Sequence, residues 1–219
     1  INKKILVYLF ILFSLGTYNK QKFSKISLPK IDNYNITGLS ESKNKKIYKK
    51  LLNLQKKILY FLKKKEVKEI IDKHKIVERF FVFKNYPSNL SITIEKTNYL
   101  ALTKIDGFNF YIGSNGNFIE AKSYSIDLPF LFGDIEITEF LKLKEIIDGS
   151  NFHYTDIKNL YYFKSKRWDI ETKDDLIIKL PIDKLKTSFE ILSKIYKNEK
   201  FKDLKIIDLR QNNLVILNG

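Results

Sequence analysis

The order in which the hydrophobic periodicity changes along the chain constrains its fold more than any other feature. Alternating apolar residues, typical of a strand, give way to two stretches with apolar residues at helical spacing, and two strand-like runs follow. The expected elements are a strand at 31–36 ended by Gly38, helices from Ser40 or Ser42 to about Leu62 and at 65–75, and strands at 77–84 and 90–96. This β-α-α-β-β order predicts a three-stranded sheet covered by two helices.

Strand signals dominate the rest of the chain. Asp106-Gly107 and Asn115-Gly116 are strong hairpin signals. The expected elements are strands at 100–105, 108–112 and 118–119, an apolar connector at 128–133, a helix at 136–148 stopped by Gly149, a hairpin at 168–180, a helix capped by Asp183, and final strands at 205–210 and 214–217. We therefore predict an antiparallel β-sheet with two packing helices, which makes the chain α+β.

An apolar run at residues 5–18 follows Lys3 and Lys4 and is typical of a signal sequence or signal anchor. It is shorter than the about 20 residues that span hydrocarbon as a straight helix, and Ser14-Leu15-Gly16 offers small residues for cleavage. Cleavage and anchoring both remain open, with a buried helix of a soluble protein as the alternative. The sequence does not begin with methionine, so we expect the true start to lie upstream. These patterns divide the chain into an anchor (1–19), a linker (20–28) and two domains (29–98 and 99–219).

The formal net charge of +15 invites a nucleic-acid or anionic-membrane hypothesis. Lysines are interleaved with acids along the whole chain, and a solvated lysine surface explains most of them. Residues 43–75 concentrate the charge, because they hold 13 lysines against Glu66, Glu69 and Asp72. Contact of the two expected helices with an anionic lipid surface is one hypothesis for this segment, and nucleic-acid binding is its rival. Export of the chain across a membrane would favour the lipid hypothesis over nucleic-acid binding.

The sequence offers no pattern for catalysis or metal binding. It contains no cysteine, so a thiolate metal site and a cysteine nucleophile are excluded. His74 and His153 each lack a second ligand at metal spacing and an adjacent nucleophile, and Asp174-Asp175 is a turn. We expect no enzyme activity, no cofactor and no metal.

Only three of the 40 basic residues are arginines, and two of them are Arg167 and Arg210. An arginine retained in such a lysine-rich chain indicates that its planar guanidinium clamps a carboxylate or stacks on a ring. Trp168, next to Arg167, is expected to fill the core. Asp208 and Arg210 share one face of a strand, so an intramolecular pair is the alternative to partner binding for Arg210.

Six short motifs occur in a fixed order along the chain. They are Ile36-Thr37-Gly38, Tyr86-Pro87 before the run 90–96, Leu128-Pro129-x-Leu131-x-Gly133, Arg167-Trp168, Leu180-Pro181 and Ile207-Asp208-Leu209-Arg210. In this order the chain resembles the FtsQ/DivIB bacterial cell-division proteins, whose members have a membrane anchor, a POTRA domain of β-α-α-β-β form and a β domain. It departs from them at Glu95-Lys96 and Asn98, where the family has Glu-Arg and then a proline, and at Gly113-Ser114-Asn115-Gly116, where it has Asp-x-x-Gly.

The resemblance implies a non-enzymatic scaffold of the divisome, a single-pass protein of the bacterial inner membrane with its bulk in the periplasm at the division septum. It implies binding to FtsB and FtsL and a part in recruiting and regulating septal peptidoglycan synthesis. The partner-binding residues that it implies, on or beside a C-terminal edge strand at about 212–217, are Arg167, Arg210, Gln211, Leu214, Val215, Ile216 and Leu217.

The last strand supports this implication, because it is apolar and carries no charge that would blunt pairing with another chain. Lys166 is an alternative to Arg167 for the basic residue that the family has before its tryptophan. The alternative functions are another exported POTRA protein, such as an outer-membrane assembly factor, and a basic nucleic-acid-binding protein.

Overall fold

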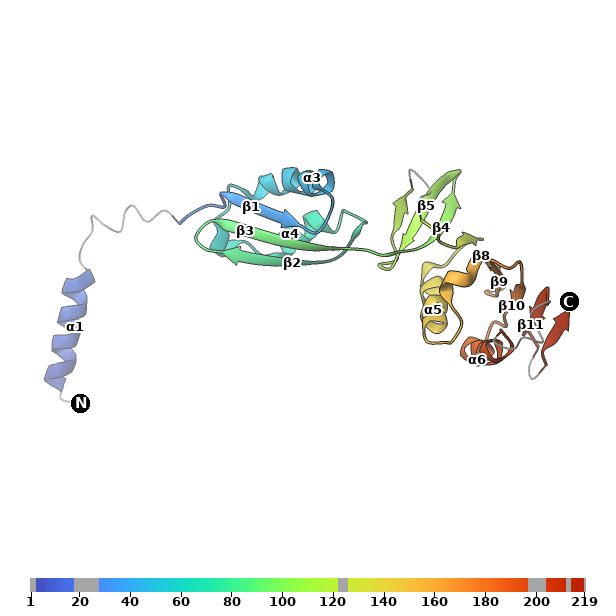
Figure 1. Cartoon of the computed structure of the whole chain (residues 1–219). Helices are drawn as coiled ribbons and strands as arrows, with labels where there is room; N and C mark the ends of the chain where they lie inside the picture. The colour runs from blue at the N-terminus through green and yellow to red at the C-terminus, as the bar shows by residue number, and fades with distance from the viewer. Residues whose placement is uncertain (1–2, 18–27, 122–125, 197–203, 212–213, 219) are drawn as a thin grey trace.

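The structure is a computed structural model that describes residues 3–17, 28–121, 126–196, 204–211 and 214–218. Its architecture is mixed α+β, with a three-stranded sheet followed along the chain by a nine-stranded sheet (Figure 1). Helix α1 (Lys3–Thr17) carries exposed apolar side chains. Within the described residues, no helix combines the length and the apolar character needed to cross a membrane.

The smaller sheet has the order β1-β3-β2. Strand β1 (Asn33–Thr37) runs parallel to β3 (Asn89–Lys96), and β2 (Val77–Asn85) pairs with β3 in the antiparallel sense. Helices α3 (Glu41–Leu51) and α4 (Lys64–Ile71) cover one face. The buried core between the layers contains Ile47, Leu51, Val67 and Ile71 from the helices and Leu90, Ile92 and Ile94 from β3. The three strands and two helices predicted from the sequence are thus present, in the predicted order.

The first helix of this unit is shorter than the sequence predicted. The apolar spacing predicted a helix to about Leu62, whereas α3 ends at Leu51 and two 3-10 turns follow, η1 (Leu52–Leu54) and η2 (Leu59–Phe61). Ile58 forms a β-bridge with Lys30, and the backbone N–H of Ile31 donates to the carbonyl of Lys57 at 3.1 Å. The helix stops because its continuation pairs with the segment that leads into β1.

The larger sheet has the order β12-β11-β10-β9-β8-β7-β4-β5-β6. Its strands are β4 (Tyr99–Ile105), β5 (Phe108–Gly113), β6 (Phe118–Glu120), β7 (Phe130–Phe132), β8 (Ile157–Tyr162), β9 (Trp168–Thr172), β10 (Ile177–Lys179), β11 (Ile206–Asp208) and β12 (Ile216–Asn218). Helix α5 (Ile137–Asp148) lies between β7 and β8, with the 3-10 turn η3 (Tyr154–Asp156) before β8, and helix α6 (Leu185–Tyr196) lies between β10 and β11.

The larger sheet is mixed, so the prediction of an antiparallel sheet was wrong. Strand β7 runs parallel to both β4 and β8, and β10 runs parallel to β11. Parallel neighbours need a crossover connection, and α5 and α6 supply two of them. The expected connector at 128–133 contains β7, which pairs on both sides, and β8 was not predicted at all.

The two faces of the larger sheet differ in character. On one face, registered neighbours from β7 to β11 are almost completely buried with α5 and α6 in one core; they are Leu131, Leu160, Ile170, Ile178 and Ile207. Trp168 joins this core and is 1% exposed, as the sequence predicted. The next row points to the opposite face and is mainly aromatic or polar; it consists of Phe132, Tyr161, Asp169, Lys179, Asp208 and Ile216.

Candidate partner-binding site

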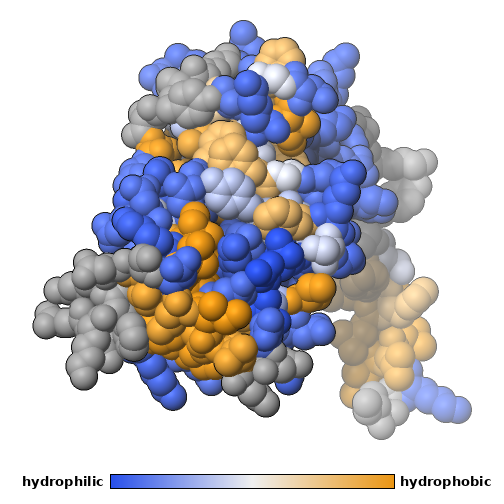
Figure 2. Space-filling view, turned by 90° about the vertical axis from the view of Figure 1, so that its right-hand side faces the viewer, coloured by the Kyte–Doolittle hydropathy of each residue, from blue (hydrophilic) through white to orange (hydrophobic). Residues whose placement is uncertain are grey.

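Strand β12 forms one edge of the larger sheet, and no described strand pairs with its outer side. Leu214, Ile216 and Leu217 are 51%, 44% and 36% exposed, and Gln211 is exposed as well. Figure 2 views the molecule from the side that holds β10, β11 and the C-terminus in Figure 1, and it shows an apolar area beside hydrophilic side chains. Val215 differs from its neighbours because it packs against the core. Residues 212–213 of the expected edge strand lie outside the described residues.

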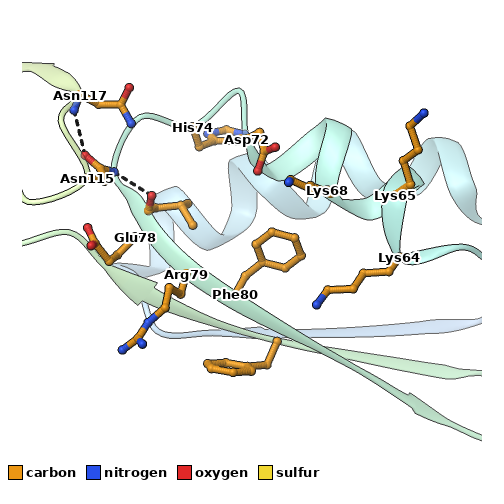
Figure 3. Close-up of a pocket in the computed structure, with 12 residues that line it drawn as sticks. Lys64, Lys65, Lys68, Asp72, His74, Glu78, Arg79, Phe80, Asn115 and Asn117 are labelled. Carbon is orange, nitrogen blue, oxygen red and sulfur yellow. Dashed lines mark hydrogen bonds between the residues drawn. The ribbon is translucent and has the colours of Figure 1, made fainter. Parts of the chain in front are cut away.

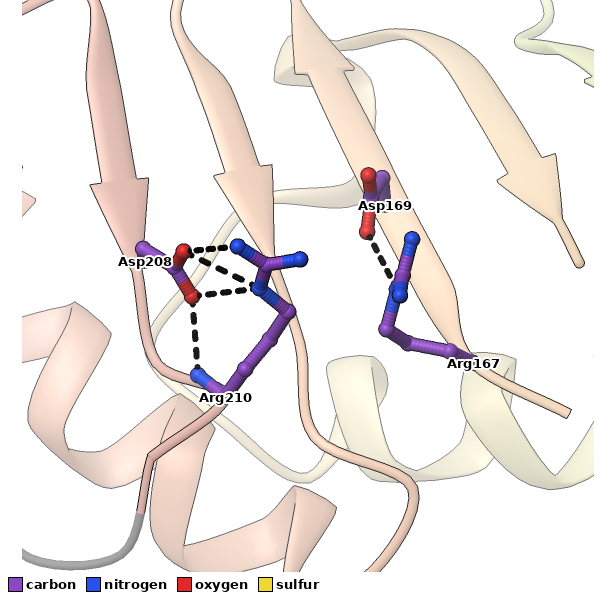
Figure 4. Close-up of polar contacts among 4 residues, drawn as sticks. All are labelled: Arg167, Asp169, Asp208 and Arg210. Carbon is purple, nitrogen blue, oxygen red and sulfur yellow. Dashed lines mark hydrogen bonds and ion pairs between the residues drawn. The ribbon is translucent and has the colours of Figure 1, made fainter. Parts of the chain in front are cut away.

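Arg210 follows β11 and holds Asp208 in a fork (Figure 4). Its Nε lies 2.8 Å from Oδ1 and 3.0 Å from Oδ2 of Asp208, Nη2 donates to Oδ2, and the backbone N–H donates to Oδ1 at 3.0 Å. These bonds lower the pKa of Asp208 and raise the pKa of Arg210. The side chain of Asp208 is 12% exposed and that of Arg210 is 40% exposed. The intramolecular pair foreseen from the sequence is present, and the guanidinium still reaches solvent.

Arg167 is held in a similar way at the start of β9. Its Nε lies 3.3 Å from Oδ1 of Asp169, and its guanidinium carbon lies 4.5 Å from the centre of the Phe163 ring. Burial raises the pKa of Asp169 in spite of the nearby guanidinium of Arg167, which lowers it. Arg167 is 28% exposed, so it offers a partner less free surface than Arg210 does.

The structure adds Asp169 and Lys179 to the candidate site, and neither was predicted from the sequence. Asp169, Lys179 and Asp208 are registered neighbours on β9, β10 and β11, so Lys179 stands between two carboxylates. Arg210 pairs with Asp208 and Arg167 pairs with Asp169, so the two predicted arginines lie in the same region of the sheet (Figure 4). The spacing of opposite charges in Arg167-x-Asp169, which equals that in Asp208-x-Arg210, is the signal that could have revealed the second pair.

A separate groove of about 840 Å³ lies between α4 and β2 of the smaller unit and the turn between β5 and β6 of the larger one (Figure 3). Its lining includes Lys64, Lys65 and Lys68 of α4, Arg79 and Phe80 of β2, and Asn115 and Asn117 from the turn between β5 and β6. This lining is basic and amide-rich. It supplies cationic and hydrogen-bonding groups, and no nucleophile is placed beside a base among the side chains that line it.

In the described residues, neither histidine forms part of a recognisable catalytic or metal-binding group. Burial lowers the pKa of His74, with the charges of Lys50 and Lys46 adding to the effect, and its Nε2 has no hydrogen-bond partner among the described residues. In the described part of the chain, no three side chains of His, Asp or Glu gather in an arrangement that could hold a metal ion.

Comparison with known proteins agrees with the resemblance in the motifs. Residues 101–210, half of the chain, match the family described as cell division protein FtsQ/DivIB, C-terminal. A solved structure of the major extracytoplasmic domain of the trans isomer of the cell division protein DivIB from Geobacillus stearothermophilus is 16% identical, with a TM-score of 0.34, and the match covers 48% of this chain and 98% of that one. A comparison with curated proteins gives no match. The matched region contains Arg167 and Arg210, the central strands of the larger sheet and the two helices that cover it, α5 and α6. The chain belongs to the FtsQ/DivIB family of cell division proteins.

Proposed function

We propose that this chain is a non-enzymatic scaffold of the divisome that takes up a strand of a partner along β12. Family membership gives it a role in bacterial cell division. The partners that we propose are the periplasmic segments of FtsB and FtsL, and the proposed result of binding is recruitment and regulation of septal peptidoglycan synthesis. Residues 29–98 would form a POTRA domain and residues 99–219 a β domain. The apolar residues of α1 would attach the chain to the inner membrane, with its bulk in the periplasm.

The observation that carries this proposal is the open edge of β12. A short strand at a sheet edge, with exposed apolar side chains and no charge of its own, presents backbone donors and acceptors to an incoming strand. Main-chain hydrogen bonds would give affinity along such an edge. The exposed side chains of Leu214, Ile216 and Leu217 would add apolar contact.

The arginines fit a role in specificity at the same end of the sheet. Arg210 has a large exposed surface while two of its nitrogens already bond Asp208. A guanidinium carries five N–H donors, so it can hold Asp208 and still donate to a partner carboxylate. The guanidinium of Arg167 lies over the ring of Phe163, and it would serve the same task with less exposure.

The test is binding of the whole chain to the cognate FtsB and FtsL periplasmic segments. We expect Ile216→Asp to weaken binding by about 2 kcal/mol or more, roughly 30-fold in Kd, because it puts a charge on the augmented edge. Ile216 is preferable to Val215, whose replacement would also disturb the core. Phe108→Asp is the matched control, since Phe108 is 65% exposed as the first residue of β5, close to the far edge of the sheet.

Arg210→Lys tests the guanidinium without leaving Asp208 unpaired. It retains the positive charge and removes the fork, so we expect about tenfold weaker binding with little change in thermal unfolding. Equal affinities for wild type, Ile216→Asp and Phe108→Asp would rule out the edge of β12 as the binding site. Absence of any binding to a folded FtsB/FtsL pair would rule out these partners.

A further inference from the structure

We propose that one end of the smaller sheet is a second membrane contact, a basic and aromatic tip that rests on the surface of an anionic bilayer. The tip consists of Lys30, Lys57, Tyr60, Phe61, Lys84 and Tyr86. It lies at the end of the unit where the chain arrives from α1 (Figure 1). This proposal narrows the lipid hypothesis from two whole helices to one end of the unit, and it rests on the proposed attachment of α1 to the membrane.

The structure brings the six residues together from three separate segments. Because β1 is parallel to β3 and β2 is antiparallel to it, the start of β1 and the end of β2 lie at the same end of the sheet. The bridge between Lys30 and Ile58 fixes the segment before η2 beside the start of β1. The Nζ of Lys84 donates to the carbonyl of Tyr60 at 3.2 Å, which fixes η2 beside the end of β2.

The aromatic side chains of the tip are not part of the core. Tyr60, Phe61 and Tyr86 are 68%, 63% and 60% exposed, although Leu59 and Leu62 on either side of the first two are buried. The rings of Tyr60 and Phe61 meet edge to face with their centres 5.3 Å apart. Aromatic side chains that project beside lysines are typical of the membrane–water interface, where the ring lies among the headgroups.

The charge of the tip matches an anionic surface. The three segments 28–32, 55–66 and 83–89 hold seven lysines against Asp32 and Glu66. Glu66 is already bonded by the ammonium of Lys57 and the backbone N–H of Lys63, which lowers its pKa. Each lysine close to an anionic leaflet strengthens membrane binding. A protein partner would need a matching acidic and apolar surface, whereas anionic phospholipid supplies both properties beside α1.

The chain itself limits how far the tip can move from a bilayer that holds α1. Leu28 follows Thr17 by 11 residues. Even when fully extended, such a segment spans at most about 40 Å. The tip therefore stays within about 40 Å of the end of α1. This raises its local concentration at the bilayer surface and favours a weak surface contact.

The experiment uses the absence of cysteine from the chain. Phe61→Cys carries an environment-sensitive fluorophore on the full-length chain in vesicles of phosphatidylcholine with or without phosphatidylglycerol, and a quencher is attached to the lipid. Phe108→Cys is the matched control because Phe108 is as exposed as Phe61 but lies in the other unit. We expect quenching at position 61 to exceed that at position 108 by about threefold, and only in vesicles with the anionic lipid.

Two double variants that remove the same charge separate the tip from the general lysine surface. Lys30→Gln with Lys84→Gln should reduce the quenching at position 61 at least to the level seen without anionic lipid. Lys45→Gln with Lys49→Gln removes the same charge from exposed positions of α3 and should leave the quenching unchanged. Equal effects of the two pairs, or equal quenching at positions 61 and 108, would overturn the proposal.

Flotation of the unlabelled chain with the same vesicles tests the attachment of α1 separately from the contact of the tip. Flotation with both vesicle types and no quenching at position 61 refutes the tip and retains the attachment. Flotation with anionic vesicles alone, together with quenching at position 61, shows that the tip binds the anionic surface by itself and refutes the attachment of α1 on which the tether argument rests. Flotation with neither refutes both.

Discussion

At the scale of single residues, Glu171 on β9 has the carboxylate with the most strongly lowered pKa on the face of the larger sheet opposite α5 and α6. Its oxygens accept hydrogen bonds from Asn159 at 2.9 Å and Tyr161 at 2.6 Å, and the ammonium of Lys158 lies 3.0 Å away. These bonds lower the pKa of Glu171 from 4.5 to about 2. Its side chain is 16% exposed, so solvent screens the interaction only in part.

We expect Glu171→Gln to lower the free energy of unfolding near neutral pH by about 1–2 kcal/mol, because the amide accepts fewer and weaker bonds. The folded-state pKa lies below the unfolded value, so the stabilisation is present above about pH 4.5 and disappears as the pH falls towards about 2. Urea unfolding of both proteins between about pH 3 and pH 7 measures this difference. The exposed Glu120 of β6 provides the control, Glu120→Gln, which should leave the free energy of unfolding nearly unchanged. A difference for Glu171→Gln that does not vary with pH would contradict the assignment.

At the scale of elements, the fit of β7 between its neighbours depends on the residue that follows it. Gly133 has φ +109°, and a Cβ there would lie 2.1 Å from the carbonyl oxygen of Tyr162 on β8. Gly107, in the turn between β4 and β5, also has a positive φ, +85°, but a Cβ would meet nothing within 4 Å. The two glycines therefore separate backbone strain alone from strain combined with a backbone clash.

Gly107→Ala should lower the free energy of unfolding by about 1 kcal/mol, which is the cost of the positive φ. Gly133→Ala should lower it by about 3 kcal/mol or more, since β7 and β8 must also move apart. Thermal or urea unfolding of the two variants against wild type tests this order. Similar losses for both would show that β8 yields to the added methyl group.

The elements that the sequence predicted well are those with an uninterrupted period. The hairpins and the helices α4, α5 and α6 have such periods, and they are found. Strand β7 has three residues and neighbours on both sides, which leaves no alternation to detect. Strand β8 alternates poorly because its pairing with β9 shifts between Ile157 and Asn159, so a bulge interrupts the pattern.

Only part of the candidate site was predicted from the sequence. Composition singled out Arg167 and Arg210, and the structure places them in one region of the sheet (Figure 4). Val215 packs against the core, and the register of β9, β10 and β11 places Lys179 between the carboxylates of Asp169 and Asp208. Register between strands distant in sequence is a tertiary property that local pattern does not contain.

At the scale of the whole molecule, two units with separate cores are joined by a short and well-bonded junction. Only Thr97 and Asn98 separate β3 from β4. Across the junction, the amide of Asn115 donates to the carbonyls of Lys75 at 3.0 Å and Val77 at 2.8 Å. Ser114 also donates to Glu78, at 2.9 Å. The turn between β5 and β6 is thereby fixed to the start of β2, and the junction sets the distance from the proposed tip to the edge of β12.

We expect Asn115→Ala to loosen the relative orientation of the two units, because it removes both of the carbonyl contacts that its amide makes across the junction. Spin labels at Lys49→Cys on α3 and Lys186→Cys on α6 report the distance between the units in a chain that has no other cysteine. The distance distribution should broaden in Asn115→Ala. It should stay narrow in Asn85→Ala, which removes an amide that bonds Ser91 within the smaller unit alone. An unchanged width in Asn115→Ala would show that backbone continuity and Ser114 suffice to hold the two units, and that the amide of Asn115 is not the element that sets their geometry.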